Sequence, residues 1–244
     1  MTKDKRAASQ DKTHKAALAS QALLSQEQVD WLFQQLAAWL PADDDNRARL
    51  VPQVKTDADL FRSLVGCLLS AQSKDENTAK AKAALMALAD TPAGILALTN
   101  EQIVAAIKPA GLYNVKARNL RKLCEHLTAS NDPIPRDRKG LMGLPGIGRK
   151  CADIVLRFAL GESVIAVDTH VHRVCNRLGL ARGKTEAETA ACLEPRVPEW
   201  ARHHGHMRLL EFGKQVCQAR KPNCAQCQLA EICAYGTLAR PDHP

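Results

Sequence analysis

The sequence predicts an all-α protein, and three observations favour this fold class. Aromatic residues are only 4% of the 244 residues, and β-branched runs are short, which disfavours a β-sandwich or barrel. Apolar residues recur at helical spacing along most of the chain. Because no heptad repeat persists, the helices should form an orthogonal array joined by short turns rather than a coiled coil.

The first helix is predicted to begin at Ser25, where Gln28 completes a capping-box pattern, and to end before Pro41. Helical periodicity then continues over residues 57–71, 75–88, 100–108, 114–129, 149–160, 168–178 and 199–216. Helix-breaking residues separate several of these segments, at positions 92, 109–111, 131–133 and 161. The chain is therefore expected to be a series of short helices with a longer one near its C-terminal end.

The composition limits the class of partner and the compartment. Lys and Arg number 34 against 26 Asp and Glu, and the net charge of +8 is a weak indication of a polyanionic partner. No run of about 20 apolar residues could span a bilayer, and residues 1–10 lack the apolar region of an export signal. The protein is therefore expected to be soluble and cytoplasmic, where its nine cysteines would stay reduced or bind metal.

Two segments are expected to lie outside the folded lobes. Residues 1–20 are basic and carry almost nothing large and apolar to bury, which predicts a flexible tail. A transit peptide is the weaker interpretation, because the segment is rich in Lys rather than Arg and contains two acidic residues. Residues 41–56 are acidic and punctuated by proline, which predicts a linker that crosses between domains.

Four cysteines near the C-terminus form the strongest local pattern, with the spacing C-x6-C-x2-C-x5-C. They are Cys217, Cys224, Cys227 and Cys233. Four thiolates within such a short loop can converge on one metal centre, and tetrahedral sulfur suits zinc and an iron-sulfur cluster equally well. The other five cysteines stand alone within helices, where they are expected to be small core residues.

A second pattern is the glycine-rich turn in Leu144-Pro-Gly-Ile-Gly-Arg-Lys150, which separates two helical segments. Amides around Gly146 and Gly148 would point outward at the start of the second helix and could hold a phosphate. An ordinary tight helix–helix turn is the alternative. With the net positive charge, the turn predicts an anion site for nucleic-acid phosphates held without reading sequence.

Asp168 follows the short apolar run Val164-Ile-Ala-Val and begins a helix, where a carboxylate is most often an N-cap. Lys150 also stands at a helix start, one helix and one turn earlier, with Arg149 beside it. A lysine amine in a cleft can attack an electrophilic carbon, although a single lysine is usually a solvated surface residue. The two residues are predicted to face one cleft from two helix N-termini.

These residues resemble those of the endonuclease III family of DNA base-excision glycosylases, a branch of the helix-hairpin-helix superfamily. Leu144 to Lys150 resembles the hairpin and its catalytic lysine, and Val167-Asp-Thr-His170 resembles the catalytic aspartate motif. The cysteine quartet resembles the ligands of a 4Fe-4S cluster. The resemblance covers about residues 25–235, and the order and spacing of three motifs make it specific.

Further positions are implied by the same resemblance. Gln72, in Leu68-Leu-Ser-Ala-Gln72, resembles the glutamine that fills the gap left by an extruded nucleotide, and Leu112 resembles the leucine that wedges into the duplex. Inserted side chains can partly offset the few kcal/mol that base flipping costs. Basic residues beside the cluster ligands, Arg220 and Lys221, would contact the DNA backbone together with Arg149, Gly146 and Gly148.

The base pocket is where the sequence departs from the family. Asp75 matches an acidic residue near that pocket, but Met142 stands where well-known members carry a glutamate that faces the damaged base. A thioether cannot accept a hydrogen bond from a base edge as a carboxylate can. The sequence therefore leaves open which damaged bases the protein removes.

The resemblance implies a two-lobed fold. A six-helix barrel with the hairpin would span residues 53–162, and an iron-sulfur cluster domain would combine residues 21–52 with 163–244. It implies a bacterial, nucleoid-associated monomer that binds double-stranded DNA containing a damaged base or an abasic site, with no membrane partner. Histidines 203, 204 and 206 are expected on the polar face of the last long helix rather than on a metal.

The implied activity is that of a bifunctional DNA glycosylase and AP lyase of base excision repair. The enzyme would remove oxidised pyrimidines and cleave the abasic strand by β-elimination through a Schiff base on Lys150, with Asp168 assisting. One rival is a mismatch-directed or adenine-removing glycosylase of the same superfamily, which Lys150 in the nucleophile position disfavours. The other rival is a non-catalytic DNA-binding module, which the retention of both Lys150 and Asp168 disfavours.

Overall fold

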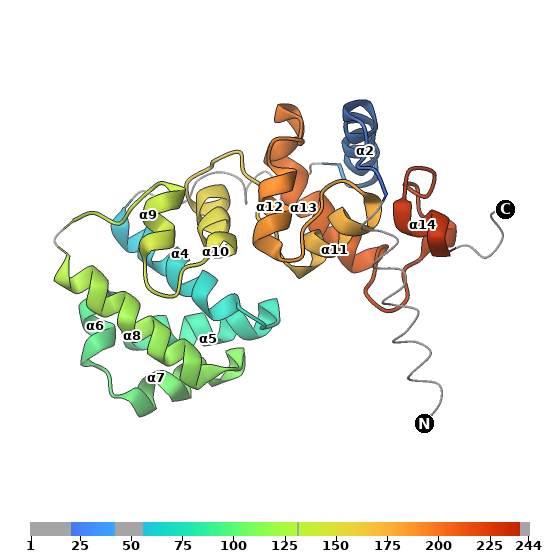
Figure 1. The fold of residues 1–244 in the computed structure, drawn as a ribbon. Coiled ribbons are helices and arrows are strands. Elements are labelled where there is room, and N and C mark those ends of the chain that lie inside the picture. The colour runs from blue at the N-terminus through green and yellow to red at the C-terminus, as the bar shows by residue number, and fades with distance from the viewer. Residues whose placement is uncertain (1–20, 42–55, 131, 240–244) are drawn as a thin grey trace, which may run out of the picture. The chain divides into compact units, whose positions relative to one another are not determined.

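The computed structural model describes residues 21–41, 56–130 and 132–239, and Figure 1 shows their arrangement in helices. Helices account for 67% of the structure, and the described residues contain no strand. The predicted all-α class is therefore confirmed. The predicted tail, residues 1–20, and nearly all of the predicted linker, residues 41–56, lie outside the described residues. None of the helices in the described part is long and apolar enough to cross a membrane.

The chain divides into two compact units, one formed by Asp45–Glu162 and the other by Met1–Asp44 together with Ser163–Pro244. The first will be called the hairpin unit, because it contains residues 144–148, and the second the cysteine unit, because it contains the cysteine quartet. Each unit has its own apolar core.

The hairpin unit follows the helical periodicity of its sequence closely. Its helices are α4 (Asp57–Ser70), α5 (Asp75–Leu88), α6 (Pro92–Ala97), α7 (Asn100–Ile107), η1 (Lys108–Ala110), α8 (Tyr113–Ala129), α9 (Arg138–Gly143), α10 (Arg149–Ile154) and η2 (Val155–Ala159). Helix α4 packs against α5, α8 and α10, and its apolar face is buried, including Leu60, Phe61 and Leu64. A capping box between Thr56 and Asp59 fixes where α4 begins.

Two details of the hairpin unit differ from the sequence prediction. Pro92 was expected to break a helix, but it is the first residue of α6, with Thr91 as the N-cap whose side chain accepts a hydrogen bond from the Gly94 amide. Proline is well tolerated there because the first helical N–H has no intrahelical partner. The segment predicted as a single helix over residues 149–160 changes from α-helix to π-helix at Val155, and Arg157 is buried in that turn.

The cysteine unit contains α2 (Gln26–Trp39), α11 (Thr169–Leu178), α12 (Glu186–Leu193), α13 (Glu199–Gln215), η3 (Cys224–Gln226) and α14 (Ala234–Ala239). The predicted capping box of Ser25 and Gln28 is confirmed at the start of α2. Helix α13 packs against both α2 and α11. Gly213 permits this approach, since a Cβ atom there would lie 3.1 Å from both His170 Cβ and Val174 Cγ2 of α11.

The histidine prediction is wrong for one of its three residues. His206 is buried, and its Nδ1 lies 2.8 Å from the Ala166 carbonyl oxygen, so it does not belong to a solvated polar face. It joins α13 to the extended segment that leads into Asp168. His203 and His204 are partly exposed, and their rings contact each other edge to face.

Candidate active site

The glycine-rich turn forms the hairpin that its sequence predicts. Helix α9 ends at Gly143 and α10 begins at Arg149, and Gly146 between them has a φ of 78°. Gly148 is the N-cap of α10 and has no side chain with which to cap it. Because the first N–H groups of a helix lack intrahelical acceptors, the start of α10 offers amide donors to an anion.

The hairpin is held in shape by a buried carboxylate that sequence reasoning missed. Asp153 of α10 is only 1% exposed, and its Oδ1 lies 2.7 Å from Arg138 Nε of α9. Its Oδ2 lies 3.4 Å from Arg149 Nε, so this predicted DNA contact is also an internal ion pair. A buried carboxylate needs such partners, and removal of either arginine would leave the negative charge of Asp153 only partly compensated.

Lys150 is the second residue of α10, and its side chain is half-buried. Its Nζ lies 3.5 Å from Ser70 Oγ, and Ser70 Oγ in turn donates a 2.7 Å hydrogen bond to the Cys67 carbonyl oxygen. Cys67 and Cys151 are buried, and Cys67 Sγ donates to the Cys151 carbonyl oxygen at 3.6 Å, which joins α4 to α10. The amine is thus held at one place by α4 and α10 rather than extending freely into solvent.

Gln72 and Leu112 share an unusual backbone. Among the described residues they are the only non-glycine residues with positive φ, at 51° and 47°. Left-handed backbone costs a non-glycine residue about 1–3 kcal/mol, and such strain is concentrated at functional sites. Both side chains are exposed, Leu112 by 53%. The structure therefore presents the two residues that the resemblance identifies as inserted into DNA.

The two residues assigned to the base pocket lie on different helices of the hairpin unit. Asp75 is the first residue of α5, two positions after the turn that carries Gln72 and Ser73. Met142 is on α9 and is 44% exposed, which is unusual for a large apolar side chain. An exposed Met beside the hairpin is consistent with a surface that contacts a ligand, as flexible thioethers often do.

Asp168 confirms the N-cap prediction. Its Oδ1 accepts hydrogen bonds from the amides of His170 and Val171, at 2.9 and 2.8 Å, at the start of α11. The bonds leave Oδ2 for another partner, since a carboxylate can accept at both oxygens. Asp168 belongs to the cysteine unit and Lys150 to the hairpin unit.

The cysteine quartet lies in a loop that two arginines of α11 organise. Arg177 donates to the carbonyl oxygens of Gln218 and Ala219 at 2.7 and 2.8 Å, and its Nη1 lies 3.6 Å from Cys217 Sγ. Arg173 Nε donates to the Cys217 carbonyl oxygen at 3.0 Å. The two arginines thus fix the backbone around Cys217 from α11.

The donor set of the quartet fits a metal centre. All four cysteines are thiols rather than disulfide sulfurs, and Cys217 and Cys233 are buried. Burial, together with the neighbouring Cys217 and Cys227, raises the pKa of Cys233 to about 11, so its thiolate needs a compensating positive charge. Within the described residues, no three His, Cys, Asp or Glu side chains are already arranged around a single ion. Arg220 and Lys221, between the first two cysteines, are exposed.

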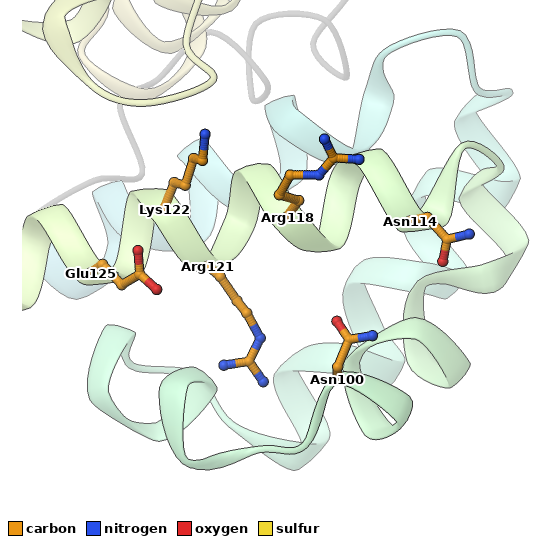
Figure 2. A pocket seen from close by; sticks show the side chains of 6 residues that line it. All are labelled: Asn100, Asn114, Arg118, Arg121, Lys122 and Glu125. Carbon is orange, nitrogen blue, oxygen red and sulfur yellow. The ribbon is translucent and has the colours of Figure 1, made fainter.

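The hairpin unit also has a basic pocket that sequence reasoning missed. It has a volume of ≈ 480 Å³, and Figure 2 shows that α8 supplies most of its lining. The lining residues are Asn100, Asn114, Arg118, Arg121, Lys122 and Glu125. Arg121 Nη2 donates to the Leu98 carbonyl oxygen at 2.6 Å, so one of the three cations is structural. The signal in the sequence was the spacing of the basic residues on one face of a helix.

Comparison with known proteins places this fold and site. The profile of the HhH-GPD superfamily of base excision DNA repair proteins matches residues 65–199. Endonuclease III of Escherichia coli K12 is 43% identical over 176 residues, which cover 72% of this chain and 83% of the relative. Endonuclease III of Thermotoga maritima is 35% identical over 187 residues, covering 75% and 87%.

Solved structures agree. A non-covalent endonuclease III–DNA complex has a TM-score of 0.76 and 35% identity, covering 88% of this chain and 97% of that one. A trapped endonuclease III–DNA covalent intermediate has a TM-score of 0.75 and 34% identity, covering 88% and 98%. A thermostable thymine-DNA glycosylase, 21% identical with a TM-score of 0.71, shares the fold.

The chain belongs to the HhH-GPD superfamily of base excision DNA repair proteins and, within it, to the endonuclease III family. The predicted family is therefore confirmed. So is the predicted enzyme class, a bifunctional DNA glycosylase and AP lyase. Family membership assigns no role to an individual side chain.

The two glycines of the hairpin give a paired prediction. A Cβ atom at Gly146 would lie 3.2 Å from Asn119 Cβ on a left-handed backbone, whereas a Cβ at Gly148 meets nothing within 4 Å. We expect Gly146→Ala to lower the melting temperature, and Gly148→Val to weaken binding to duplex DNA while the melting temperature stays unchanged. Thermal melting and salt titrations of DNA affinity check both. Unchanged affinity of Gly148→Val at every salt concentration would contradict phosphate binding by this turn.

Proposed function

We propose that Lys150 is the nucleophile of this DNA glycosylase and AP lyase. The observation that carries the proposal is the place of its amine, at the start of the hairpin helix and 3.5 Å from Ser70 Oγ. The neutral amine attacks C1′ of an extruded nucleotide, and the base leaves with the electrons of the glycosidic bond and takes up a proton. The attached nitrogen loses a proton and the C1′–O4′ bond breaks, with O4′ taking up a proton, so that the sugar ring opens to a Schiff base. The Schiff base acidifies the C2′ proton, and loss of that proton breaks the bond between C3′ and the phosphate oxygen, which leaves with the phosphate.

The experiment that tests this proposal uses the covalent intermediate. Borohydride reduces a Schiff base to a stable amine, so adding it during turnover should attach the enzyme to abasic or thymine-glycol duplex DNA. A glycosylase that uses activated water instead of an amine would give no adduct. Absence of trapping on an abasic duplex that the protein nonetheless cleaves would overturn the assignment of an amine nucleophile.

Asp168 is proposed to act on the same nucleotide. With Oδ1 held by two amides of α11, its second oxygen can stabilise positive charge developing on the sugar and help to move a proton. The order of the hairpin and aspartate motifs in the chain and the resemblance to the family support this role.

Replacing Asp168 by asparagine separates the capping role from the chemical one. Asn can still accept both amide hydrogen bonds of α11, so we expect the melting temperature to be retained. Loss of the carboxylate should lower the single-turnover rate by at least about 10²-fold, the low end for a positioned acid–base group. Asp168→Ala is the comparison variant, because it removes cap and charge together. A single-turnover rate of Asp168→Asn equal to that of the unmodified enzyme would show that the residue is only a cap.

The DNA partner is proposed to be a duplex that contains a damaged base or an abasic site. Gln72 and Leu112 would enter the duplex, while Gly146, Gly148 and Arg149 would hold phosphates near the lesion. Arg220 and Lys221, exposed on the cysteine loop, would hold the backbone elsewhere. We propose that the enzyme acts as a monomer on the DNA of the bacterial cytoplasm.

Oxidised pyrimidines are the proposed substrates, with Asp75 and Met142 at the base pocket. Because Met142 is exposed on α9 and its thioether is only a weak hydrogen-bond acceptor, it would select bases by apolar contact rather than by polar pairing. Gel assays across a panel of duplexes with single lesions test this. Met142→Glu should shift the order of preference among lesions, and an unchanged order would remove Met142 from the pocket.

The cysteine quartet is proposed to hold a 4Fe-4S cluster, as the resemblance implies. Cys217, Cys224, Cys227 and Cys233 would be the four ligands, and the cluster would serve as a structural centre that orders the loop between them. Its cationic core would compensate the buried thiolates that Arg173 and Arg177 already accompany. The cysteine-loop residues that meet DNA would then be placed by the cluster.

A further inference from the structure

A single buried lysine joins the two loops that carry Gln72 and Leu112. Lys116 of α8 is 3% exposed, and its Nζ donates to two backbone carbonyl oxygens, those of Leu69 and Ala110, at 2.8 Å each. Leu69 precedes Gln72 by three residues, and Ala110 precedes Leu112 by two. One ammonium group thus ties together two segments that are 41 residues apart in the sequence, the difference between positions 69 and 110.

The end of α4 needs such a donor. The residue that follows this helix, Ala71, has φ −56° and ψ 119°, so no left-handed glycine cap satisfies the last carbonyl groups. The Ser73 amide donates to the Ser70 carbonyl oxygen at 3.1 Å, which closes a turn with Ala71 and Gln72 at its centre. A turn with positive φ at its third residue usually has Gly there. Gln72 occupies that position in spite of the strain, and Lys116 holds the helix end from which the turn departs.

The other loop is anchored in the same way. The Gly111 amide closes η1 by donating to the Lys108 carbonyl oxygen at 3.1 Å, and Leu112 then adopts left-handed backbone before α8. The Leu112 carbonyl oxygen accepts from the Lys116 amide at 3.0 Å, while the Lys116 ammonium reaches back to Ala110. Lys116 therefore contacts this loop twice, through its ammonium group at Ala110 and through its backbone amide at Leu112.

Burial of the Lys116 ammonium group costs desolvation free energy. It lowers the pKa of Lys116 because the ammonium form loses its hydration. Two backbone carbonyls replace part of that hydration, and no carboxylate is needed for the contact. Lysine residues are seldom buried unless they are paired. An apolar side chain in this position would avoid the cost of removing a charged group from water.

We propose that Lys116 is a positioning residue that fixes the two DNA-inserting loops relative to each other, so that Gln72 and Leu112 enter the duplex together when a nucleotide is extruded. The inference rests on the proposed function of those two side chains. When the ammonium group is absent, the carbonyl groups of Leu69 and Ala110 lose their shared donor, and each loop can relax from its strained turn independently. Lys116 then affects the opening of paired DNA and not the chemistry at Lys150.

The test compares Lys116→Met on two substrates, because methionine keeps most of the volume but cannot donate. The substrates are an abasic site in a fully paired duplex and the same site within a short unpaired bubble, where no stacked gap has to be filled. We expect strand cleavage on the paired duplex to slow by at least about tenfold, since misplacing a group by about 1 Å can cost 10²-fold. Cleavage in the bubble should stay within about threefold, the range of a substitution without a specific role.

Two controls keep this comparison decisive. Lys82→Met removes another partly buried lysine of the same unit, from α5, and should leave the ratio of the two rates unchanged. Lys116→Arg keeps a cation that can donate to both carbonyls, so it should restore much of the paired-duplex rate, and it serves as the informative variant if Lys116→Met does not fold. Equal losses of rate on both substrates, or a folded Lys116→Arg that behaves as Lys116→Met does, would overturn the proposal.

A double-mutant cycle tests the route of the effect. If Lys116 acts through the inserted side chains, Lys116→Met should have little further effect on paired-duplex cleavage in a Gln72→Ala/Leu112→Ala background. A full additional loss there would refute the route. Failure of the proposed function looks different, because the unmodified enzyme would then fail to cleave the bubble substrate as well.

Discussion

Replacing Lys150 by glutamine is expected to abolish strand cleavage and borohydride trapping together, while duplex binding and the melting temperature are retained. Glutamine is close in size and lacks the nucleophilic electron pair, so it removes the step that forms the Schiff base. Its amide can still donate to Ser70 Oγ, which preserves the contact that places the residue at 3.5 Å in the native enzyme. The effect should be larger than that of any other single substitution in the hairpin unit.

The measurements are single-turnover cleavage of an abasic duplex, covalent trapping, and affinity for a non-cleavable abasic analogue. Lys80→Gln, on the exposed surface of α5, is the matched control and should cleave normally. If Lys150→Gln cleaves abasic DNA at the rate of the unmodified enzyme after nucleases have been removed, the nucleophile is another amine. Loss of binding together with cleavage would instead point to a role in holding DNA.

The sequence was sufficient for those parts of the site that depend on local backbone. The N-cap at Asp168 could be predicted because the first amides of a helix lack intrahelical acceptors, and a carboxylate directly before the helix can accept their hydrogen bonds. The hairpin could be predicted because the left-handed backbone at its turn favours a glycine, Gly146, and because a periodic segment, residues 149–160, follows it. For the same reason most helix bounds were predicted to within one or two residues.

The parts that escaped prediction depend on contacts between distant segments. Lys116 lies in a helical segment as an ordinary lysine would, and nothing nearby in the sequence shows that the carbonyls of Leu69 and Ala110 converge on it. Asp153 looks like a surface residue until α9 brings Arg138 to it.

The short helices were missed for a related reason. Segments such as α6 and α9, of six residues each, contain too few turns for apolar periodicity to be visible. Both begin with a side-chain cap, from Thr91 and Asp137, and these two capping residues are visible in the sequence. Capping residues therefore carry more information than periodicity for elements of this length.

Replacing Cys224 by alanine is expected to remove the metal centre and unfold the loop between Cys217 and Cys233. This loop contains only η3, a helix of three residues, and the hydrogen bonds from Arg173 and Arg177 reach only its first residues, Cys217 to Ala219. A structural metal contributes about 10 kcal/mol or more to a small domain, which is comparable to the whole stability of about 5–15 kcal/mol of a typical protein. Because Cys217, Leu229 and Cys233 belong to the core of the cysteine unit, the loss should spread to α11 and α14.

Native protein purified without oxygen should contain close to four iron and four acid-labile sulfide per chain and absorb visible light, whereas Cys224→Ala should contain neither. Cys192→Ala is the matched control, since Cys192 is also half-buried in the cysteine unit but lies outside the quartet. Cys192→Ala should retain the metal, and its melting temperature should lie within a few degrees of that of the native protein. Stoichiometric zinc with no iron in the native protein would refute the cluster while keeping the metal site. Full metal content and unchanged melting of Cys224→Ala would remove this cysteine from the ligand set.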